Sequence, residues 1–274
     1  MLKKILGFMS LFLFIAAPNA FAAEKVRGAG IREAIDIVEN VSRDFNKKNP
    51  EITITHKELP KAADVVTAVG KGERDYGVLN RGLNDKEKEL YPDMQTYLFA
   101  KDGIVFVVHP DNPVKSITGA QLKEILQGKA TDWSQVGGKK GVISMLILRD
   151  KRAVERTAVE KYVLGKDKMA VGRIREVGNL RGVRGEVELD NSAMGYLLMS
   201  GVGKKVKALE LDGLAPKKGE VKTGAYPLAV QFFFITKGDP SPNMQKFMDF
   251  LYSPEGGKLV EKGKVSFIAR SAGQ

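Results

Sequence analysis

The sequence predicts an α/β protein, and two observations carry that prediction. The segment Asp102–Gly138 reads, in unbroken order, as a buried strand, a turn, a capped helix and a second turn. The N-terminal third of the chain alternates helical and extended patterns, which is typical of α/β proteins rather than of all-β proteins.

The run Ile104–Val108 predicts a strand. Its five residues are all apolar and mostly β-branched, and Gly103 and His109-Pro110 bound it on either side. The run is too short for a helix. A continuous apolar stretch of this length indicates a strand covered on both faces, as in a parallel or mixed sheet.

The residues after this strand predict a turn and then a short helix. Residues 110–113 (PDNP) have turn chemistry, because proline fixes φ and Asp or Asn bonds its own backbone. Thr118 and Gln121 have the spacing of a capping box, with Ile117 placed to pack on Leu122. Gly128 stands where a left-handed C-terminal cap belongs.

The remaining elements follow from helical spacing or from apolar alternation. We expect helices over 31–47, 62–69, 153–164, 243–252 and 254–262, and strands over 52–55, 76–79, 142–148, 205–211 and 228–236. The charge run Lys86–Glu89 is interpreted as a solvated segment.

The first 22 residues have the pattern of a cleaved signal peptide. Lys3 and Lys4 form a basic region, residues 5–17 are apolar, and Ala20-Phe21-Ala22 is a small-x-small site with cleavage expected after Ala22. No other segment approaches the length of a membrane span. The chain has no Cys, so neither a disulfide framework nor a lipid-attachment Cys is available. We therefore expect a periplasmic protein that does not span the membrane when mature.

The formal net charge of +11 is unevenly distributed. Residues 139–185 hold 13 Lys and Arg against 5 Asp and Glu. A solvated face and a surface that attracts an anion or an acidic partner both account for this excess, and the sequence leaves both open.

Several function classes are excluded. His56 and His109 are the only histidines and lie 53 positions apart, so a transition-metal site is not expected. There is no G-x-S-x-G elbow, P-loop or dinucleotide fingerprint. The basic segments lack interleaved aromatic residues, which disfavours nucleic acid as a partner in an exported chain. We expect no enzymatic activity and no cofactor.

A series of short motifs resembles the phosphate-binding proteins of bacterial ABC importers, over nearly all of the mature chain. The motifs are Gly28-Ala29-Gly30, Asp75-Tyr76-Gly77, Asp102-Gly103, residues 109–113 (HPDNP), residues 125–128 (ILQG), Asp132-Trp133, Val136-Gly137-Gly138, residues 193–196 (AMGY), Tyr226-Pro227-Leu228 and residues 251–256 (LYSPEG).

This resemblance implies a two-lobed type II periplasmic-binding-protein clamshell, in which each lobe is a mixed sheet flanked by helices. Residues 23–100 plus 228–274 would form the first lobe and residues 101–227 the second. Two crossover strands, around 100–109 and 223–230, would act as a hinge that closes around a ligand.

The resemblance also implies an anion site where helix N-termini of the two lobes meet. Arg149 matches the arginine of the family motif, and Arg32 and Arg152 are expected to substitute for lost hydroxyls. The residues expected to bind ligand are Gly30, Ile31, Arg32, Asn80, Arg81, Arg149, Lys151, Arg152 and Ala153.

The chain departs from the family at this site. The family motif Arg-x-x-x-Ser-Gly-Thr retains its arginine here, but Ala153-Val154-Glu155 replaces Ser-Gly-Thr. Each lost hydroxyl donor to a buried dianion removes on the order of 1.5–3 kcal/mol, and a carboxylate facing phosphate adds repulsion. Three alternatives stay open: ordinary surface or inter-lobe ion pairs without a ligand, an altered site for an oxyanion, carboxylate or zwitterion, and retained phosphate binding.

We expect a monomeric solute-binding protein that holds phosphate or another small anion and delivers it to an inner-membrane ABC permease. The rival hypothesis is a clamshell without a ligand that docks an acidic partner through its basic second lobe. A sensor that couples the same fold to signalling is a third hypothesis.

Overall fold

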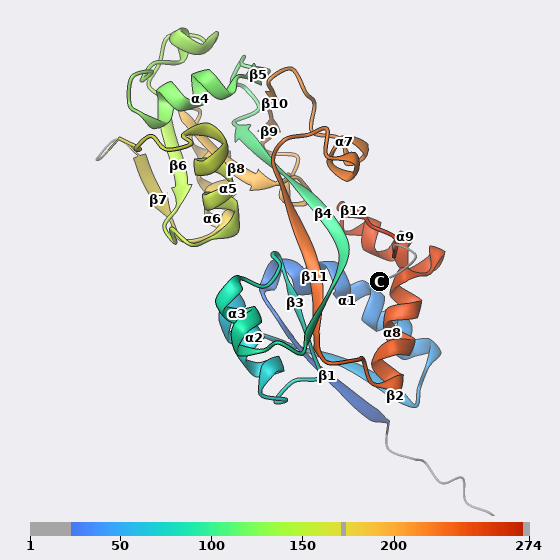
Figure 1. Cartoon of the computed structure of the whole chain (residues 1–274). Coiled ribbons are helices and arrows are strands. Elements are labelled where there is room, and N and C mark those ends of the chain that lie inside the picture. Colours follow the sequence, from blue (N-terminus) through green and yellow to red (C-terminus); the bar gives the residue numbers. More distant parts are fainter. Residues whose placement is uncertain (1–22, 171–173, 271–274) are drawn as a thin grey trace, which may run out of the picture.

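The computed structural model describes residues 23–170 and 174–270, so the predicted signal peptide lies outside the described residues. The chain forms two lobes joined by long strands (Figure 1). One sheet runs through both lobes in the order β2-β1-β3-β11-β4-β8-β6-β7.

The first lobe is built on the β2–β4 side of this sheet. β1 (Glu24–Gly30) is parallel to β2 (Ile52–Glu58) and to β3 (Tyr76–Leu79), whereas β11 (Ala229–Lys237) runs antiparallel to β3 and β4. The helices of this lobe are α1 (Arg32–Lys48), α2 (Ala62–Gly70), α3 (Asp85–Leu90), α8 (Pro242–Tyr252) and α9 (Pro254–Lys262). α1, α8 and α9 pack together on one side of the sheet, and α2 packs on β1, β3 and β11 (Figure 1).

The second lobe continues the sheet with β8 (Ala193–Leu198), β6 (Ser144–Leu148) and β7 (Ile174–Val177). Its helices are α4 (Gly119–Leu126), α5 (Val154–Val163), α6 (Leu180–Leu189) and α7 (Lys218–Thr223), with 3-10 turns at Trp133–Val136 and Met199–Gly201. β9 (Lys207–Ala208) pairs with β4, β12 (Ser266–Phe267) pairs with β4 in the first lobe, and β5 (Ser116–Ile117) pairs with β10 (Glu210–Leu211).

The strand β4 (Met94–Val108) connects the lobes. It pairs with β11 up to Gly103 and with β8 from Ile104 onward. Residues 102–108 are all buried, which confirms the prediction of a strand covered on both faces. The returning chain is fixed to β4 nearby, because the Tyr226 hydroxyl donates to the carbonyl of Ile104 at 3.1 Å.

The predicted capping box is confirmed. The Thr118 hydroxyl accepts from the N–H of Gln121 at 3.1 Å, and the Gln121 side chain accepts from the N–H of Thr118 at 2.9 Å. Gly128 adopts φ +69°, which favours glycine.

Two interpretations were wrong in part. The charge run at 86–89 is exposed at Lys86, Lys88 and Glu89, as expected, but it lies inside helix α3, where Glu87 is buried and closes a capping box with Asn84. The expected strand over 205–211 is two short strands, β9 and β10, because residues 207–208 pair with β4 and residues 210–211 pair with β5.

Candidate functional site

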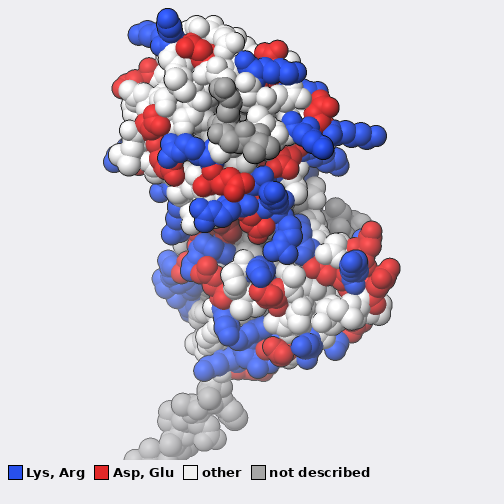
Figure 2. Space-filling model, turned by 90° about the vertical axis from the view of Figure 1, so that its left-hand side faces the viewer, with Lys and Arg blue, Asp and Glu red and all other residues white. Residues whose placement is uncertain are grey.

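A cavity of about 1230 Å³ lies between the lobes. From the first lobe it is lined by the start of α1, the segment that leads into α2, and the loop after β3. From the second lobe it is lined by the β6–α5 junction, the start of α6 and residues 197–201. Figure 2 shows one face of the molecule, with acidic and basic side chains intermixed where the two lobes meet.

Three helices begin at this cavity without a cap from their N-cap residue. The N-cap residues of α1, α2 and α5 are Ile31, Lys61 and Ala153, and none of their side chains makes a capping hydrogen bond. Of the other described helices, α3, α4, α6, α8 and α9 are each capped by an Asn, Thr or Ser side chain, whereas α7, which lies outside the cavity lining, has no such cap. The first N–H groups of a helix have no intrahelical partner and carry partial positive charge, so these first turns favour an anion in the cavity.

The α1 end of the cavity is shaped by close packing. Gly30 ends β1 and is buried, and a Cβ at this position would lie 2.4 Å from Cγ2 of Val78. The N–H of Ile31 donates to the carbonyl of Val78 at 3.3 Å. Ile31 lines the cavity, whereas Gly30 does not. The absence of a side chain at Gly30 therefore allows α1 to pack closely against β3.

The two predicted arginines of the first lobe line the cavity but are paired within their own lobe. Arg32 forms ion pairs with Glu58 and, at 3.5 Å, with Asp36. The Arg81 guanidinium donates two hydrogen bonds of 2.7 Å to the Glu87 carboxylate. Burial raises the pKa of Glu87, but hydrogen bonds from Arg81 and from the N–H of Asn84 hold it below its ordinary value. Both guanidinium groups are therefore largely neutralised by carboxylates.

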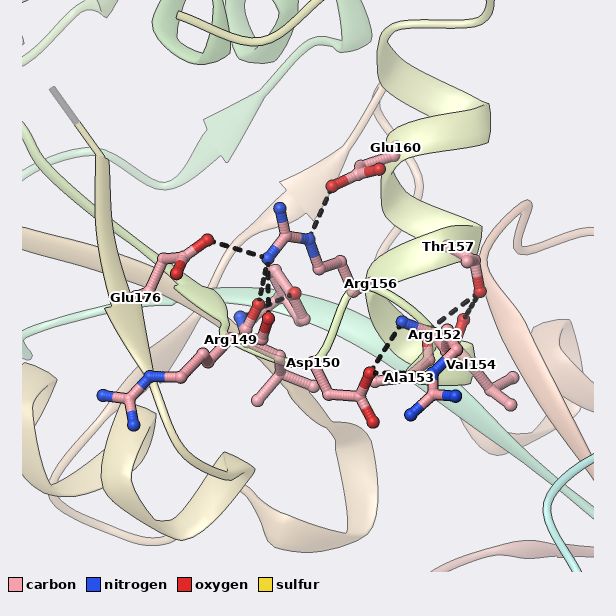
Figure 3. A network of polar contacts seen from close by, with 11 residues as sticks. Arg149, Asp150, Arg152, Ala153, Val154, Arg156, Thr157, Glu160 and Glu176 are labelled. Carbon is pink, nitrogen blue, oxygen red and sulfur yellow. Dashed lines mark hydrogen bonds and ion pairs between the residues drawn. The ribbon is translucent and has the colours of Figure 1, made fainter. Parts of the chain in front are cut away.

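The predicted cations of the second lobe take different positions, and Figure 3 labels two of them, Arg149 and Arg152. Arg152 lines the cavity with a mostly exposed side chain and lies 3.6 Å from Asp150. Lys151 is exposed and does not line it. Arg149 is also exposed and outside the lining, and its side chain extends away from Asp150 and Arg152.

The buried arginine of this region is Arg156, which sequence reasoning did not single out. Its guanidinium donates to the carbonyl of Leu148 at 2.5 Å and to the carboxylates of Glu160 and Glu176 at 2.6 and 3.1 Å (Figure 3). These bonds fasten the first turn of α5 to the end of β6 and to β7. Arg156 thus positions the α5 N-terminus rather than lining the cavity.

The lobes are bridged across the cavity by Asn80 and Glu155. Asn80 follows β3, and its side-chain amide donates to the Glu155 carboxyl at 3.1 Å. Both side chains are buried. Burial raises the pKa of Glu155, and the charge of Glu33 adds to this rise. A second contact, between Arg181 and Asp36 at 3.7 Å, is exposed and joins α6 to α1.

A second buried carboxyl, Asp102, lies on β4. It accepts from the N–H of Ser200, and burial raises its pKa to about 7, with a further contribution from the charge of Glu155. Within 23–170 and 174–270, no Lys or Arg forms an ion pair with either Asp102 or Glu155. In the sequence, Asp102 stands out only as part of the Asp102-Gly103 motif, because its burial depends on the tertiary structure.

Other classes of site find no support in the described part of the chain. It contains no group of three or more His, Cys, Asp or Glu side chains suited to hold a metal ion. None of its helices combines the length and apolarity that crossing a membrane would require.

Comparisons with known proteins agree with this architecture. A family model described as a PBP superfamily domain matches residues 16–255. The phosphate-binding protein PstS of Bacillus subtilis is 28% identical over 225 residues, which cover 82% of this chain and 74% of the relative. The PstS protein of Borreliella burgdorferi is 22% identical over 82% of this chain and 84% of its own length.

Solved structures show the same likeness. A putative phosphate ABC transporter substrate-binding protein with bound phosphate, from Clostridium perfringens, superimposes with a TM-score of 0.77 at 25% identity and covers 89% of this chain and all of the other. An ABC-type phosphate transport receptor from Vibrio cholerae gives a TM-score of 0.72 at 23% identity, over 89% of this chain and 99% of the other. The predicted clamshell fold is confirmed. The chain belongs to the family of PBP superfamily domains and is related to phosphate-binding proteins.

Proposed function

We propose that this chain is the substrate-binding protein of an ABC importer and that it binds a small anion, with phosphate as the first candidate, between its two lobes. One observation carries the proposal. The first turns of three helices, α1 and α2 from the first lobe and α5 from the second, line one cavity, and none of these helices is capped by the side chain of its N-cap residue. The phosphate-binding proteins among its relatives support phosphate as the ligand class.

The proposed site is a subset of the residues expected from the sequence. The residues that follow Ile31 and Ala153 present first-turn backbone N–H groups, Asn80 presents an amide, and Arg152 is a lining arginine whose ion pair is long, at 3.6 Å, and exposed. Arg32 and Arg81 add little positive charge to the site, because Glu58 pairs with Arg32 and Glu87 pairs with Arg81. Gly30, Arg149 and Lys151 are proposed to act outside direct contact with the ligand.

Closure of the lobes would complete this site. We propose residues 23–100 plus 228–274 as the first lobe and 101–227 as the second, with β4 and the chain entering β11 as the hinge. The pattern of the first 22 residues supports export to the periplasm. An inner-membrane ABC permease is the proposed partner, and we assign no catalytic role to the cavity.

Calorimetric titration tests the proposal with phosphate, sulfate and small carboxylates as probes. We expect saturable binding of at least one anion, weakened about tenfold in Arg152→Ala, because a charge-assisted contact is lost from a largely solvated side chain. Lys151→Ala is the matched control, since it removes a neighbouring exposed cation outside the cavity. Failure of every anion to bind, or equal losses in the two variants, would contradict the proposed site.

A further inference from the structure

The α5 end of the cavity already contains an anion that belongs to the chain. Glu155 is the second residue of α5, whose N-cap residue Ala153 offers no acceptor. Glu155 is 5% exposed and lies on the cavity wall. A carboxylate at the first turn of a helix is stabilised by the same N–H groups that would hold an external anion. Glu155 therefore competes with any ligand for this helix end.

The surroundings of Glu155 satisfy its hydrogen bonds without neutralising its charge. Asn80 donates at 3.1 Å from the opposite lobe, but an amide carries no positive charge. The titratable groups that act on Glu155 or respond to it are all acidic or neutral: Glu33 on α1, Asp102 on β4 and the buried Tyr196 on β8.

The cavity's cations are directed elsewhere. Among the described residues, no ion pair joins Glu155 to any Lys or Arg that lines the cavity. These cations are Arg32, Lys61, Arg81, Arg152, Arg181 and Arg184. On α5 itself, Arg156 is bound by Glu160 and Glu176. Bringing a second anion beside an ionised Glu155 is therefore unfavourable, whereas a protonated Glu155 is neutral and donates a hydrogen bond.

We infer that Glu155 is a specificity-determining residue that couples anion binding in the cleft to the uptake of one proton by its own carboxyl group. This inference rests on the proposed function. The proton comes from solvent and is released when the anion leaves. The raised pKa of Glu155 agrees with this coupling, because burial already favours the protonated form. The cleft should accordingly select singly charged oxyanions over dianions.

Sulfate and phosphate are the probes, because sulfate keeps a constant charge between about pH 6 and pH 8 whereas phosphate titrates. Calorimetry in buffers of different ionisation heat counts the protons taken up on binding. With sulfate as the probe, we expect for the unmodified chain close to one proton taken up per anion at about pH 7.5 and an affinity that falls up to about tenfold per pH unit. In Glu155→Gln, which keeps an oxygen for Asn80, the uptake should vanish and affinity at that pH should rise at least about tenfold.

Glu89→Gln is the matched control, because Glu89 is an exposed carboxylate outside the cavity lining, and it should retain the proton uptake. Glu155→Thr replaces the carboxyl with a hydroxyl and should behave like Glu155→Gln, which keeps the test valid if one variant folds poorly. Sulfate binding with equal proton counts in the unmodified chain and both Glu155 variants would overturn this inference and leave the proposed function standing. No anion binding by any variant would overturn both.

Discussion

The side-chain amide of Asn80 in the first lobe donates a 3.1 Å hydrogen bond to the carboxyl of Glu155 in the second lobe. The two residues are 75 positions apart, and they are 7% and 5% exposed. This bond joins the loop after β3 to the first turn of α5 across the cavity. The bond therefore links the relative position of the lobes to the protonation state of the Glu155 carboxyl group.

Asn80→Ala should weaken the contact between the two lobes. It leaves the Glu155 carboxyl without its side-chain donor, and an unsatisfied buried acceptor costs about 1–3 kcal/mol. We expect a lower free energy of unfolding, with a larger loss at about pH 8 than at about pH 5, because an ionised carboxylate needs the donor more. Chemical denaturation at the two pH values measures this. Asn191→Ala, at an exposed asparagine, is the control, and an equal loss in both variants would contradict the role of the bond.

Asp102→Asn should stabilise the protein at alkaline pH. The pKa of Asp102 is raised to about 7 in the folded chain, so the folded state holds this proton more tightly than the unfolded state. Its contribution to stability is therefore present at acidic pH and is lost as the pH rises towards about 7. A shift of about three units corresponds to at most about 4 kcal/mol.

The free energy of unfolding of Asp102→Asn, measured from about pH 4 to about pH 8, should exceed that of the unmodified chain by an amount that grows up to about pH 7 and then levels. The introduced amide retains an oxygen that can accept from the N–H of Ser200, so we expect the variant to keep the same fold. Parallel pH profiles for the two chains would show that the buried carboxyl does not titrate in this range.

Gly30→Ala should destabilise the first lobe through packing alone. A Cβ at Gly30 would lie 2.4 Å from Val78 and 2.9 Å from Ile35, and overpacking of this kind costs about 1–3 kcal/mol. Gly219→Ala, in α7, meets no atom within 4 Å and should be neutral or slightly stabilising. Thermal unfolding compares the two variants. A stable Gly30→Ala protein that has lost only anion binding would instead place Gly30 in direct contact with the ligand.

Much of the fold was predictable because local chemistry and tertiary structure agree. The apolar run Ile104–Val108 needs burial on both faces, and β4 provides it. The Thr118 capping box is closed by residues only three positions apart, so its spacing sufficed. Helix α3 was missed because its charged residues form no apolar stripe, and the Asn84 cap and the Arg81–Glu87 pair hold it in place.

The site was less predictable, because it depends on where side chains point and on distant partners. Arg149 follows a strand, and its outward direction cannot be read from a motif. One carboxylate partner of Arg32, Glu58, lies 26 positions away, on β2. Asp102 and Glu155 acquire raised pKa values mainly because the folded chain excludes water around them. The helix N-termini were anticipated from the family resemblance, whereas their missing caps became evident from the structure.

Amide NMR during a phosphate titration shows whether the helix N-termini bind the anion, because it reports each backbone N–H separately. We predict that the largest shifts fall on the first-turn amides of α1 and α2, at Arg32, Glu33, Ala62 and Ala63, with smaller shifts at the start of α5, where Glu155 competes. Shifts confined to exposed Lys residues of the second lobe, or no saturable shift at any of these first-turn amides, would contradict it.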